Sequence, residues 1–394
     1  MTVFQKKIVT LINQQKKLFT KKNMRGLQHN GIYQRWLNPV ITAEHVPVSW
    51  RYDFDEKNNP QLLERMGINA TFNAGAIYWK NKYLVVVRVE ANDRKSFFAV
   101  AESDNGIDNF CFWDYPVTLP QTDQTDTNVY DMRLTAHDDG YIYGVFCTER
   151  KDKLLPDDSS AAQAKCGVAR TKDFLHWERL ADLISPGAQQ RNVVLHSEFV
   201  DGKYAFYTRP QHDFMGVGGS GGIAWGLSDS IENAEIKNET IIDAKCYHTI
   251  KEVKNGQGPA PLKTEQGWLH LAHGVRKTAA GLRYVLYMFM TALDRPWVVI
   301  YQPAGHLLAP QSGERVGDVS NVVFSNGWIV NEKRDVFIYY ASSDTRLHIA
   351  TSTLDLLIDY VVNSPRDTLS SASNVVVRKH MNKKNRDIIK GILG

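Results

Sequence analysis

The sequence predicts an all-β fold, a five-bladed β-propeller with N- and C-terminal helical extensions, and three observations support this. A unit of two β-rich runs joined by a polar turn occurs five times. The turns follow one another at intervals of 59 to 67 residues, near Asn81, Gly140, Gly202, Gly267 and Arg334. Helical periodicity is confined to the two ends of the chain. A repeat of this period with several strands per unit is typical of propeller blades.

The first element is a helical extension, which we assign to residues 1–40. Phe4, Ile8, Ile12 and Phe19 are spaced as on one face of a helix, with lysines between them. We expect an amphipathic helix that packs on the body of the protein or on another subunit.

The five units follow in residues 41–365, the predicted propeller domain. Asp-Gly pairs between apolar runs indicate tight hairpins in two of the units. A third β-rich run follows in each unit, and several units then add a turn and an aromatic residue, which predicts four strands per blade. A β-sandwich or two stacked β domains is the alternative, whereas no βαβ alternation supports a parallel α/β fold. The hairpin runs read AGAIYWKNKYLVVVRVE, MRLTAHDDGYIYGVFCTER, VVLHSEFVDGKYAFYTRPQ, PAPLKTEQGWLHLAHGVR and NVVFSNGWIVNEKRDVFIYYASSD.

The last element is a helical tail, residues 366–394. Its apolar positions are Ile388, Ile389, Ile392 and Leu393, and its basic residues give the segment from Arg378 onward a net charge of +5. No acidic residue precedes Glu44, so the N-terminal segment carries +8, and the residues between the two ends carry −9 against an overall +4. Basic ends are also found in nucleic-acid-binding arms, but we interpret these as solvated helix faces and expect no nucleic-acid partner.

The composition is that of a globular protein, with 43% hydrophobic and 23% charged residues. The four cysteines have no metal-ligand or CxxC spacing, which favours free thiols in a reducing compartment. Residues 1–25 lack the apolar core of a signal peptide, and no apolar run is long enough to span a membrane. We therefore expect a cytoplasmic protein without membrane contact.

The residues that carry chemistry are expected at one mouth of the channel. The first strand of a blade lines the channel and the second runs antiparallel to it, so first-strand starts and second-strand ends open onto the same mouth. Charged side chains there are costly unless they are paired or meet a ligand. The first-strand starts are Asn73, Asp131, Arg191 with Asn192, Gly258-Pro259, and Asp318 with Asn321; the second-strand ends are Arg88 with Glu90, Glu149 with Arg150, Arg209, His273 and Asp344.

The balance of charge in this ring points to a reaction. An inverting glycosidase needs two carboxylates, one of which activates water. Here Asp131 stands opposite Arg191, Arg209 and His273, and guanidinium groups bind phosphate in a bidentate manner. Phosphate is already anionic at neutral pH and needs no general base, so one acid and a basic pocket make a complete phosphorylase site.

Two further motifs are weaker. The segment GVGGSGG (216–222) lacks the Lys-Ser/Thr of a P-loop, and we interpret it as a flexible loop over the mouth. His137-Asp138-Asp139 lies in a predicted hairpin turn, so we interpret it as a turn rather than a metal site. No Gly-x-Ser-x-Gly or Cys/His nucleophile arrangement is present.

Several long segments resemble family 130 of the glycoside hydrolases, the β-mannoside phosphorylases. The resemblance covers nearly the whole chain and is closest to the branch that acts on 4-O-β-D-mannosyl-D-glucose. It implies a five-bladed propeller, in agreement with the repeat. The segments are NATFNAGAI, RVEANDRKSFFAVAESDNGIDNF, NVYDMRLTAH, QQRNVVLHSEFVDGKYAFYTRPQ, GPAPLKTEQGWLHLAHGV, GDVSNVVFSNGW and IYYASSDT.

The resemblance also implies the roles of individual residues. Asp131, the aspartate of the Tyr-Asp-x-Arg segment, would be the catalytic acid, with its proton relayed through the mannose 3-hydroxyl. Phosphate would attack with inversion, giving α-D-mannose 1-phosphate and glucose, and no metal or organic cofactor is needed. Homo-oligomers are common in the family, which would suit the terminal helices. The implied phosphate ligands are Arg191, Asn192, Arg209, His273 and Tyr284, and the implied sugar contacts are Asn73, Arg88, Arg94, Arg150 and Asp344.

Other functions remain open at this point. A β-1,4-mannooligosaccharide phosphorylase would share the mannosyl site and differ beyond the cleaved bond, where the loops 151–165 and 212–222 are expected to shape the acceptor site. A β-mannosidase would need a second carboxylate, for which Glu149 and Asp344 are the visible candidates. A non-catalytic mannoside-binding propeller would need neither Asp131 nor the basic cluster.

Overall fold

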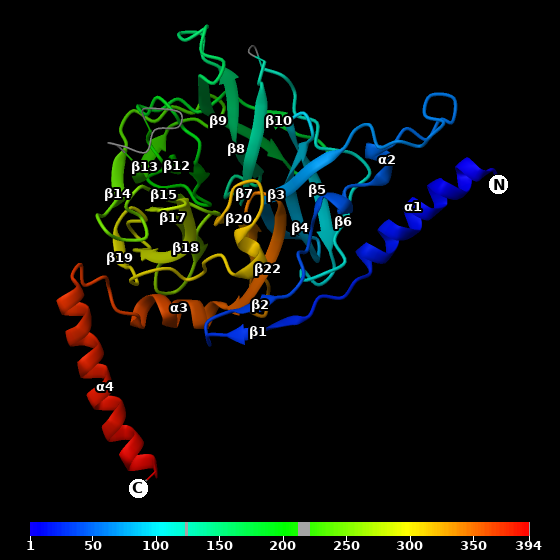
Figure 1. Cartoon of the computed structure of the whole chain (residues 1–394). Coiled ribbons are helices and arrows are strands. Elements are labelled where there is room, and N and C mark those ends of the chain that lie inside the picture. Colours follow the sequence, from blue (N-terminus) through cyan, green and yellow to red (C-terminus); the bar gives the residue numbers. More distant parts are fainter. Residues whose placement is uncertain (123–124, 212–220, 394) are drawn as a thin grey trace.

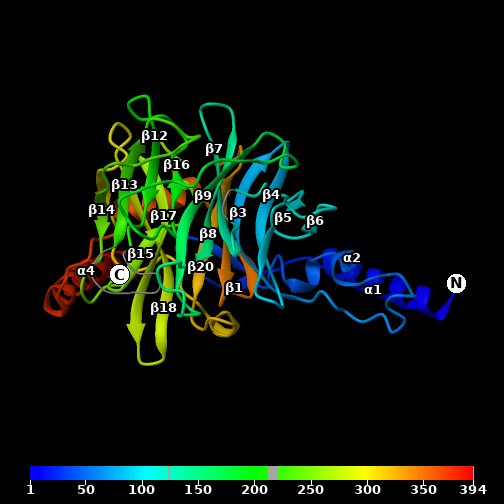
Figure 2. The same cartoon turned by 90° about the horizontal axis from the view of Figure 1, so that it is seen from above.

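A computed structural model describes residues 1–122, 125–211 and 221–393. Its strands form five antiparallel sheets arranged around a central axis (Figures 1 and 2). The predicted five-bladed propeller is therefore confirmed. The innermost strands of neighbouring blades lie side by side, with β20 (Val323–Val330) next to β3 (Ile68–Trp79) and β3 next to β7 (Asn128–Ala136).

The remaining strands complete each blade from the channel outward. Blade one adds β4 (Lys82–Ala91), β5 (Ser96–Ser103) and β6 (Cys111–Phe112); blade two adds β8 (Ile142–Lys151), β9 (Ala162–Thr171) and β10 (Glu178–Arg179). Blade three consists of β11 (Val194–Leu195), β12 (Tyr204–Thr208), β13 (Gly222–Ser228) and β14 (Thr240–Ala244). Blade four consists of β15 (Lys254–Gln257), β16 (Leu262–Lys263), β17 (Trp268–Thr278), β18 (Gly281–Thr291) and β19 (Val299–Tyr301), and blade five adds β21 (Asp335–Ser342) and β22 (Arg346–Thr353).

The hairpin turns lie where the sequence predicts them, and each has a left-handed residue. The positive φ angles are 62° at Asn81, 83° at Gly140, 72° at Gly202, 158° at Gly267 and 65° at Arg334. Glycine and asparagine tolerate this region best, so these residues define the hairpins of the five blades.

The blades are held together by strands that are apolar on both faces. In β4, Val85 and Val87 pack towards blade five, whereas Leu84 and Val86 pack towards blade two. Because side chains alternate along a strand, this near-continuous apolar run fills both interfaces at once.

The N-terminal segment contains more than the expected helix. Helix α1 (Val3–Phe19) starts with a capping box in which Thr2 and Gln5 bond reciprocally. The chain then forms β1 (Arg25–His29) and β2 (Gln34–Trp36), and β2 pairs with β22 on the outer edge of blade five. The segment 1–40 thus supplies the outer strands of the last blade as well as a helix. Three short helices lie in the loops: η1 (Ala43–His45), α2 (Val48–Arg51) and η2 (Ser312–Arg315).

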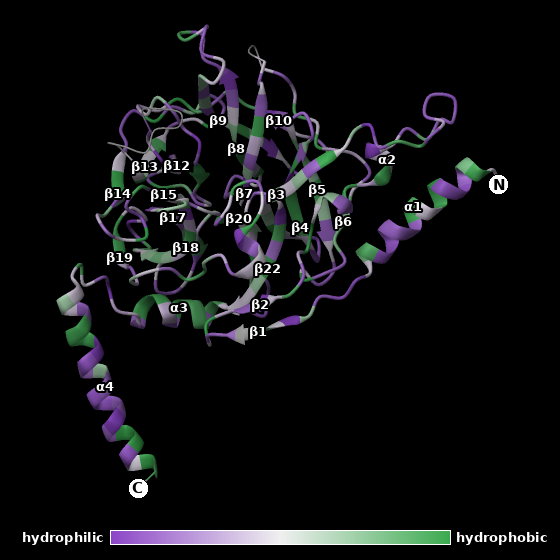
Figure 3. Cartoon of the chain, in the orientation of Figure 1, coloured by the Kyte–Doolittle hydropathy of each residue, from purple (hydrophilic) through white to green (hydrophobic). Residues whose placement is uncertain are grey.

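Two helices end the chain and differ in burial. Helix α3 (Leu354–Asn363) follows β22 directly and buries Leu354, Leu357 and Val361 in the core shared by blades four and five. Helix α4 (Ser371–Leu393) buries none of its described residues and extends away from the body (Figure 1), with apolar and polar residues mixed along it (Figure 3). None of the helices in the described ranges is both long and apolar enough to cross a membrane.

Candidate active site

Two β-bulges place the first pair of site residues. The pairing of β3 with β4 shifts between Phe72 and Gly75, and that of β7 with β8 shifts between Tyr130 and Arg133. The bulged residues Asn73 and Asp131 have φ angles of 46° and 62°. Left-handed non-glycine residues at bulges are strained and concentrate at functional sites. Here they bring the two side chains together, because Asn73 Nδ2 donates to Asp131 Oδ1 at 2.9 Å.

Arg88 is the second partner of Asp131. Its Nη1 donates to the same Oδ1 at 3.2 Å, its Nη2 to Glu90 at 2.8 Å and its Nε to Ser96 Oγ at 3.0 Å. The guanidinium lies over the ring of Phe72, 4.4 Å from its centre. Since both donors reach Oδ1, Oδ2 is the oxygen of Asp131 on which a transferable proton would sit.

Blade three brings Arg191 to the same region. Its guanidinium lies 5.7 Å from the ring centre of Tyr130, whose hydroxyl donates to Glu149 at 3.0 Å. Burial alone would lower the pKa of Arg191, but its neighbours, Tyr130 first and Asp131 among them, raise it. Arg191 therefore stays charged beside the acid.

A cluster of buried donors continues through blades three and four. Arg209 Nη1 approaches His273 Nε2 at 3.3 Å, and Arg209 Nη2 donates to Gln211 at 3.1 Å. Because a guanidinium only donates, Nε2 accepts and the proton of this imidazole lies on Nδ1. Burial, then Arg209, lower the pKa of His273 well below its ordinary value, so the ring is neutral. Tyr284 stacks near it, with the ring centres 6.2 Å apart.

Two further cations belong to this cluster. Lys254 Nζ lies 5.4 Å from the ring centre of Tyr284, and burial, with Arg209 and Arg191 adding to it, lowers the pKa of Lys254 to about 7. Arg133 is fully buried and donates to the carbonyls of Gly258 and Asp131 at 3.0 and 2.9 Å. Burial lowers the pKa of Arg133 to about 10. Among the described residues, Arg133, Arg209 and Lys254 contact carbonyls, rings and an amide rather than carboxylates, so this part of the cluster can accept an anion.

Several buried polar atoms of the cluster lack a hydrogen-bond partner within the described part of the chain. They are both side-chain atoms of Asn192, His273 Nδ1, Arg209 Nε and Arg133 Nη2. Asn192 and His273 pack against the backbone of Gly256, where a Cβ would collide with both side chains. An unsatisfied buried polar group costs about 1–3 kcal/mol, and an anion with several acceptor oxygens would satisfy these donors.

Apart from Arg88 on blade one and Glu149 on blade two, the charges at the mouth are divided by sign. Arg133, Arg191, Arg209 and Lys254 come from blades two to four. The carboxylates Glu90, Asp318 and Asp344 come from blades one and five, and Asp131 interacts with both groups, raising the pKa of Arg191 and of Asp344. The site can therefore hold an anion beside an acid.

Two other predicted sugar contacts, Arg94 and Arg150, form no hydrogen bond with Asp131 among the described residues. Arg94 is exposed in the turn between β4 and β5, with φ 68°. Arg150 on β8 forms ion pairs with Asp126 and Asp182, each at 2.7 Å. Their contacts with a sugar remain predictions, as do the roles of the other predicted site residues.

Lys254 and Arg133 were not among the predicted site residues. The repeat places the start of blade four at Gly258, but its innermost strand begins at Lys254, four residues earlier. Arg133 is part of the Tyr-Asp-x-Arg segment, and its burial beside a charged cluster could not be read from that pattern. The only available signal was its position two residues after Asp131, on the same face of a strand.

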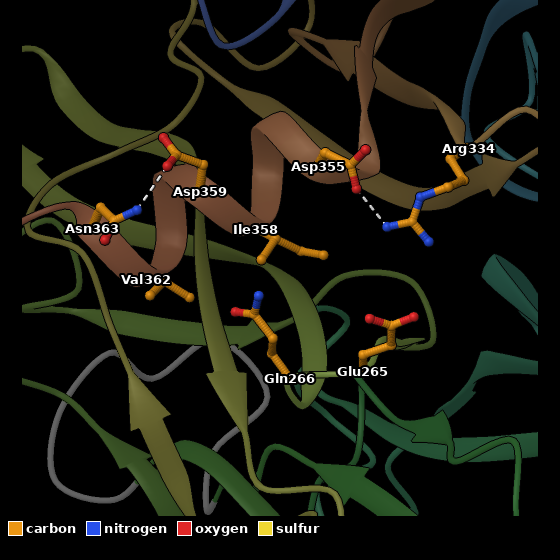
Figure 4. A pocket seen from close by; sticks show the side chains of 8 residues that line it. All are labelled: Glu265, Gln266, Arg334, Asp355, Ile358, Asp359, Val362 and Asn363. Carbon is orange, nitrogen blue, oxygen red and sulfur yellow. Dashed lines mark hydrogen bonds and ion pairs between the residues drawn. The ribbon is translucent and has the colours of Figure 1, made fainter.

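Other features lie apart from this cluster. A pocket beside α3 is lined by residues of the turns before β17 and β21 and of α3 itself, among them Gln266, Arg334 and Asp355 (Figure 4).

His137 begins the turn between β7 and β8, as expected. Within residues 1–122, 125–211 and 221–393, no three His, Cys, Asp or Glu side chains are grouped to hold a metal ion. Residues 212–220, which include most of the loop 212–222 and of the glycine-rich segment 216–222, lie outside the described residues. The loop expected at 151–165 is shorter, because β9 begins at Ala162.

Comparison with known proteins gives consistent results. The profile of glycoside hydrolase family 130, described as β-1,4-mannooligosaccharide phosphorylase, matches residues 43–363. The chain is 59% identical over 391 residues to the 4-O-β-D-mannosyl-D-glucose phosphorylase of Bacteroides fragilis, covering 99% of this chain and 100% of the relative. It is 28% identical to the β-1,4-mannooligosaccharide phosphorylase of Ruminococcus albus, over 81% of this chain and 92% of the relative.

A solved structure shows the same fold. The β-1,2-mannobiose phosphorylase of Listeria innocua superposes with a TM-score of 0.66 at 18% identity, covering 86% of this chain and 99% of that one. With the profile match over most of the chain and the high identity over its full length, this protein belongs to glycoside hydrolase family 130.

Proposed function

We propose that this chain catalyses the reversible, inverting phosphorolysis of 4-O-β-D-mannosyl-D-glucose to α-D-mannose 1-phosphate and D-glucose. The name of the Bacteroides fragilis relative supports this substrate. The observation that carries the proposal is the position of one carboxylic acid, Asp131, next to Arg88 and Arg191 and on the same side of the propeller as the buried guanidinium of Arg209.

Phosphate is the proposed nucleophile, bound by Arg191, Asn192, Arg209, His273 and Tyr284, to which we add Lys254. The buried donors of Arg209, Asn192 and His273 that have no partner among the described residues match the acceptor oxygens of a phosphate. One phosphate oxygen forms a bond to the anomeric carbon as the glycosidic bond breaks. The anion supplies its own negative charge, so this half of the site needs only to position it.

Asp131 is the proposed acid for the leaving glucose oxygen. Asn73 and Arg88 hold its Oδ1, which orients the carboxyl group and leaves Oδ2 to give up the proton. The proton reaches the leaving oxygen through the mannose 3-hydroxyl. Asn73, Arg88, Arg94, Arg150 and Asp344 are the proposed sugar contacts, and no metal or organic cofactor is required.

The terminal helices are proposed to form contacts between copies of this chain in a cytoplasmic homo-oligomer. Helix α4 exposes Val376, Ile389 and Ile392 together with six basic residues, and the body of the chain between the two basic ends is acidic. Opposite charges of this kind suit a contact between copies.

The test is a product assay with Asp131→Asn. The wild type should convert mannosyl-glucose only when phosphate is present and release mannose 1-phosphate. The variant should keep its fold, measured by circular dichroism, and lose turnover by at least about 10²-fold, because an amide cannot donate the proton. Near wild-type turnover by the variant would remove Asp131 from the mechanism.

The same assay separates the other functions. Free mannose formed without phosphate would indicate a β-mannosidase, and sugar binding without turnover would indicate a binding protein. Synthesis from mannose 1-phosphate with glucose or mannose as acceptor compares the proposed activity with that of a mannooligosaccharide phosphorylase. Faster synthesis with mannose would overturn the proposed acceptor.

A further inference from the structure

The acidic half of the mouth has more negative charge than its one arginine can neutralise. Arg88 uses all three of its nitrogens, on Asp131, Glu90 and Ser96. Asn69 Nδ2 joins Glu90 to Asp318, at 3.1 and 2.7 Å, and adds no charge. Asp131 and Glu90 therefore share a single guanidinium, and Asp318 is joined to Glu90 only through a neutral amide, before Asp344 is counted.

The turn that carries Asp344 on blade five is bonded to this group on both sides, because Val319 N, next to Asp318, donates to the Ser343 carbonyl at 3.2 Å and Thr71 N, on the strand of Asn69, donates to the Thr345 carbonyl at 3.4 Å. The charged groups that act on Asp344 are Asp131 on β7, Arg88 and Glu90 on β4, and Asp318 in the loop before β20, and its own charge acts on Tyr284 of β18. No ion pair joins Asp344 to a cation in the part of the chain that the structure describes. A proton on Asp344 is the remaining way to reduce the repulsion.

The backbone fixes Asp344 in this position. Ser343 and Asp344 are consecutive left-handed residues, with φ angles of 48° and 53°. Ser343 N donates to the Val322 carbonyl at 2.9 Å and Ser343 Oγ to the Glu314 carbonyl at 2.7 Å, which hold the turn. Left-handed non-glycine residues are strained, so the fold maintains a strained turn that presents this carboxyl group.

We propose that Asp344 acts as a neutral carboxylic acid that donates a hydrogen bond to a hydroxyl of the bound mannosyl group, and that its ionisation weakens sugar binding. An ionised carboxylate can only accept, and a sugar that covers the site would leave its charge desolvated next to Asp131. Asp344 is thus a positioning residue for the sugar. The inference rests on the proposed function.

The pH range follows from the surroundings of Asp344. Burial first, and then Asp131, raise the pKa of Asp344 to about 7, with Arg88 opposing the increase. If the complex requires the neutral acid, affinity is full below that pH and falls about tenfold per pH unit above it, or about 50-fold between pH 7 and pH 9. Binding at pH 8 should then take up a proton.

The experiment is isothermal titration calorimetry of the full chain with 4-O-β-D-mannosyl-D-glucose in phosphate-free buffer, where no turnover occurs. Buffers of different ionisation enthalpy report the protons taken up. We expect uptake at pH 8 and the 50-fold loss of affinity in the wild type, and neither in Asp344→Asn, whose amide mimics the neutral acid. Binding by the wild type without proton uptake would overturn the inference, and this result does not depend on how the variant folds.

Two controls assign the proton. Asp201→Asn changes an aspartate with nearly the same φ, 52°, in the turn between β11 and β12, and should behave as the wild type. Lys254 titrates in the same pH range, so the inference requires that Lys254→Met still takes up a proton when it binds the sugar. If proton uptake is lost in Lys254→Met and kept in Asp344→Asn, the inference is overturned. Asp344→Asn that is folded yet binds no sugar at pH 6 contradicts a neutral donor. If the wild type binds no sugar at any pH, the proposed function itself fails.

Discussion

Replacing Lys254 by methionine should make the protein more stable and bind phosphate less well. Lys254 is half-buried next to Arg209 and Arg191, and its ammonium group contacts the ring of Tyr284 rather than a carboxylate. The folded protein therefore carries a cation that is partly desolvated and repelled by its neighbours. A methionine of similar length removes the charge and keeps most of the apolar stem.

The size of the effect follows from the pKa of Lys254, which falls from 10.5 to about 7 on folding. The unfolded chain keeps this proton up to about pH 10.5, whereas the folded chain loses it as the pH rises through about 7. The lysine therefore opposes folding most at and below pH 7. At about 1.4 kcal/mol per pH unit, the full cost is about 4 kcal/mol at pH 7, and partial exposure reduces this to about 2–4 kcal/mol. By pH 9.5 it should decrease to about 1 kcal/mol.

The assay is urea unfolding of the wild type and Lys254→Met in phosphate-free buffer at pH 7 and pH 9.5. The variant should have the higher free energy of unfolding at pH 7, and most of its advantage should disappear at pH 9.5. Phosphate at 100 times its Kd should add about 2.7 kcal/mol to the wild type and less than half of that to the variant. A variant that is less stable at pH 7, or that gains equally at both pH values, would refute the reasoning.

Four other variants test the site and the surface. Arg191→Ala and Arg209→Ala should each raise the KM for phosphate by at least tenfold, since a charge-assisted hydrogen bond contributes about 1.5–3 kcal/mol. The control Arg170→Ala, which breaks surface pairs with Glu178 and Glu232, should leave this KM unchanged. Initial rates measured against phosphate concentration decide this. Gly256→Ala should raise the same KM because its Cβ would displace Asn192 and His273, and an unchanged value would place phosphate elsewhere. A chain ending at residue 370 should keep the circular dichroism signal of the propeller strands, because α4 buries no described residue of its own chain, but should contain fewer subunits per particle by light scattering. An unchanged number of subunits would remove α4 from the interface.

The fold was predictable because each blade has a local signal of its own. Hairpins with left-handed residues such as Gly140 and Arg334 depend on a few neighbouring residues, and their regular spacing reveals the repeat. The start of β7 was predictable as a site for the same reason, since Asp131 lies at a repeated position. These features need no knowledge of distant contacts.

The remaining features depend on contacts between distant parts of the chain. Strand β2 is short and polar, and it becomes a strand only because β22 offers a free edge more than 300 residues later. Arg150 is at a strand end like Arg88, yet Asp126 and Asp182 bind it. Lys254 has an ordinary sequence context, and its pKa is lowered first by burial and then by Arg209 and Arg191 on another blade.

The division of charge at the mouth explains how one symmetric fold can orient two different substrates. In the proposed mechanism, the carboxylates of blades one and five repel phosphate and Arg209 and Lys254 attract it, which directs it to one half of the site. The uncharged sugar meets no such barrier and can bind over the acidic half, beside Asp131. Attack with inversion needs the nucleophile and the departing oxygen on opposite sides of one carbon, and placing the anion and the acid on different blades provides that separation. The cost is the desolvation of these cations, and then the repulsion among them, when phosphate is absent, and Lys254→Met should recover this stability.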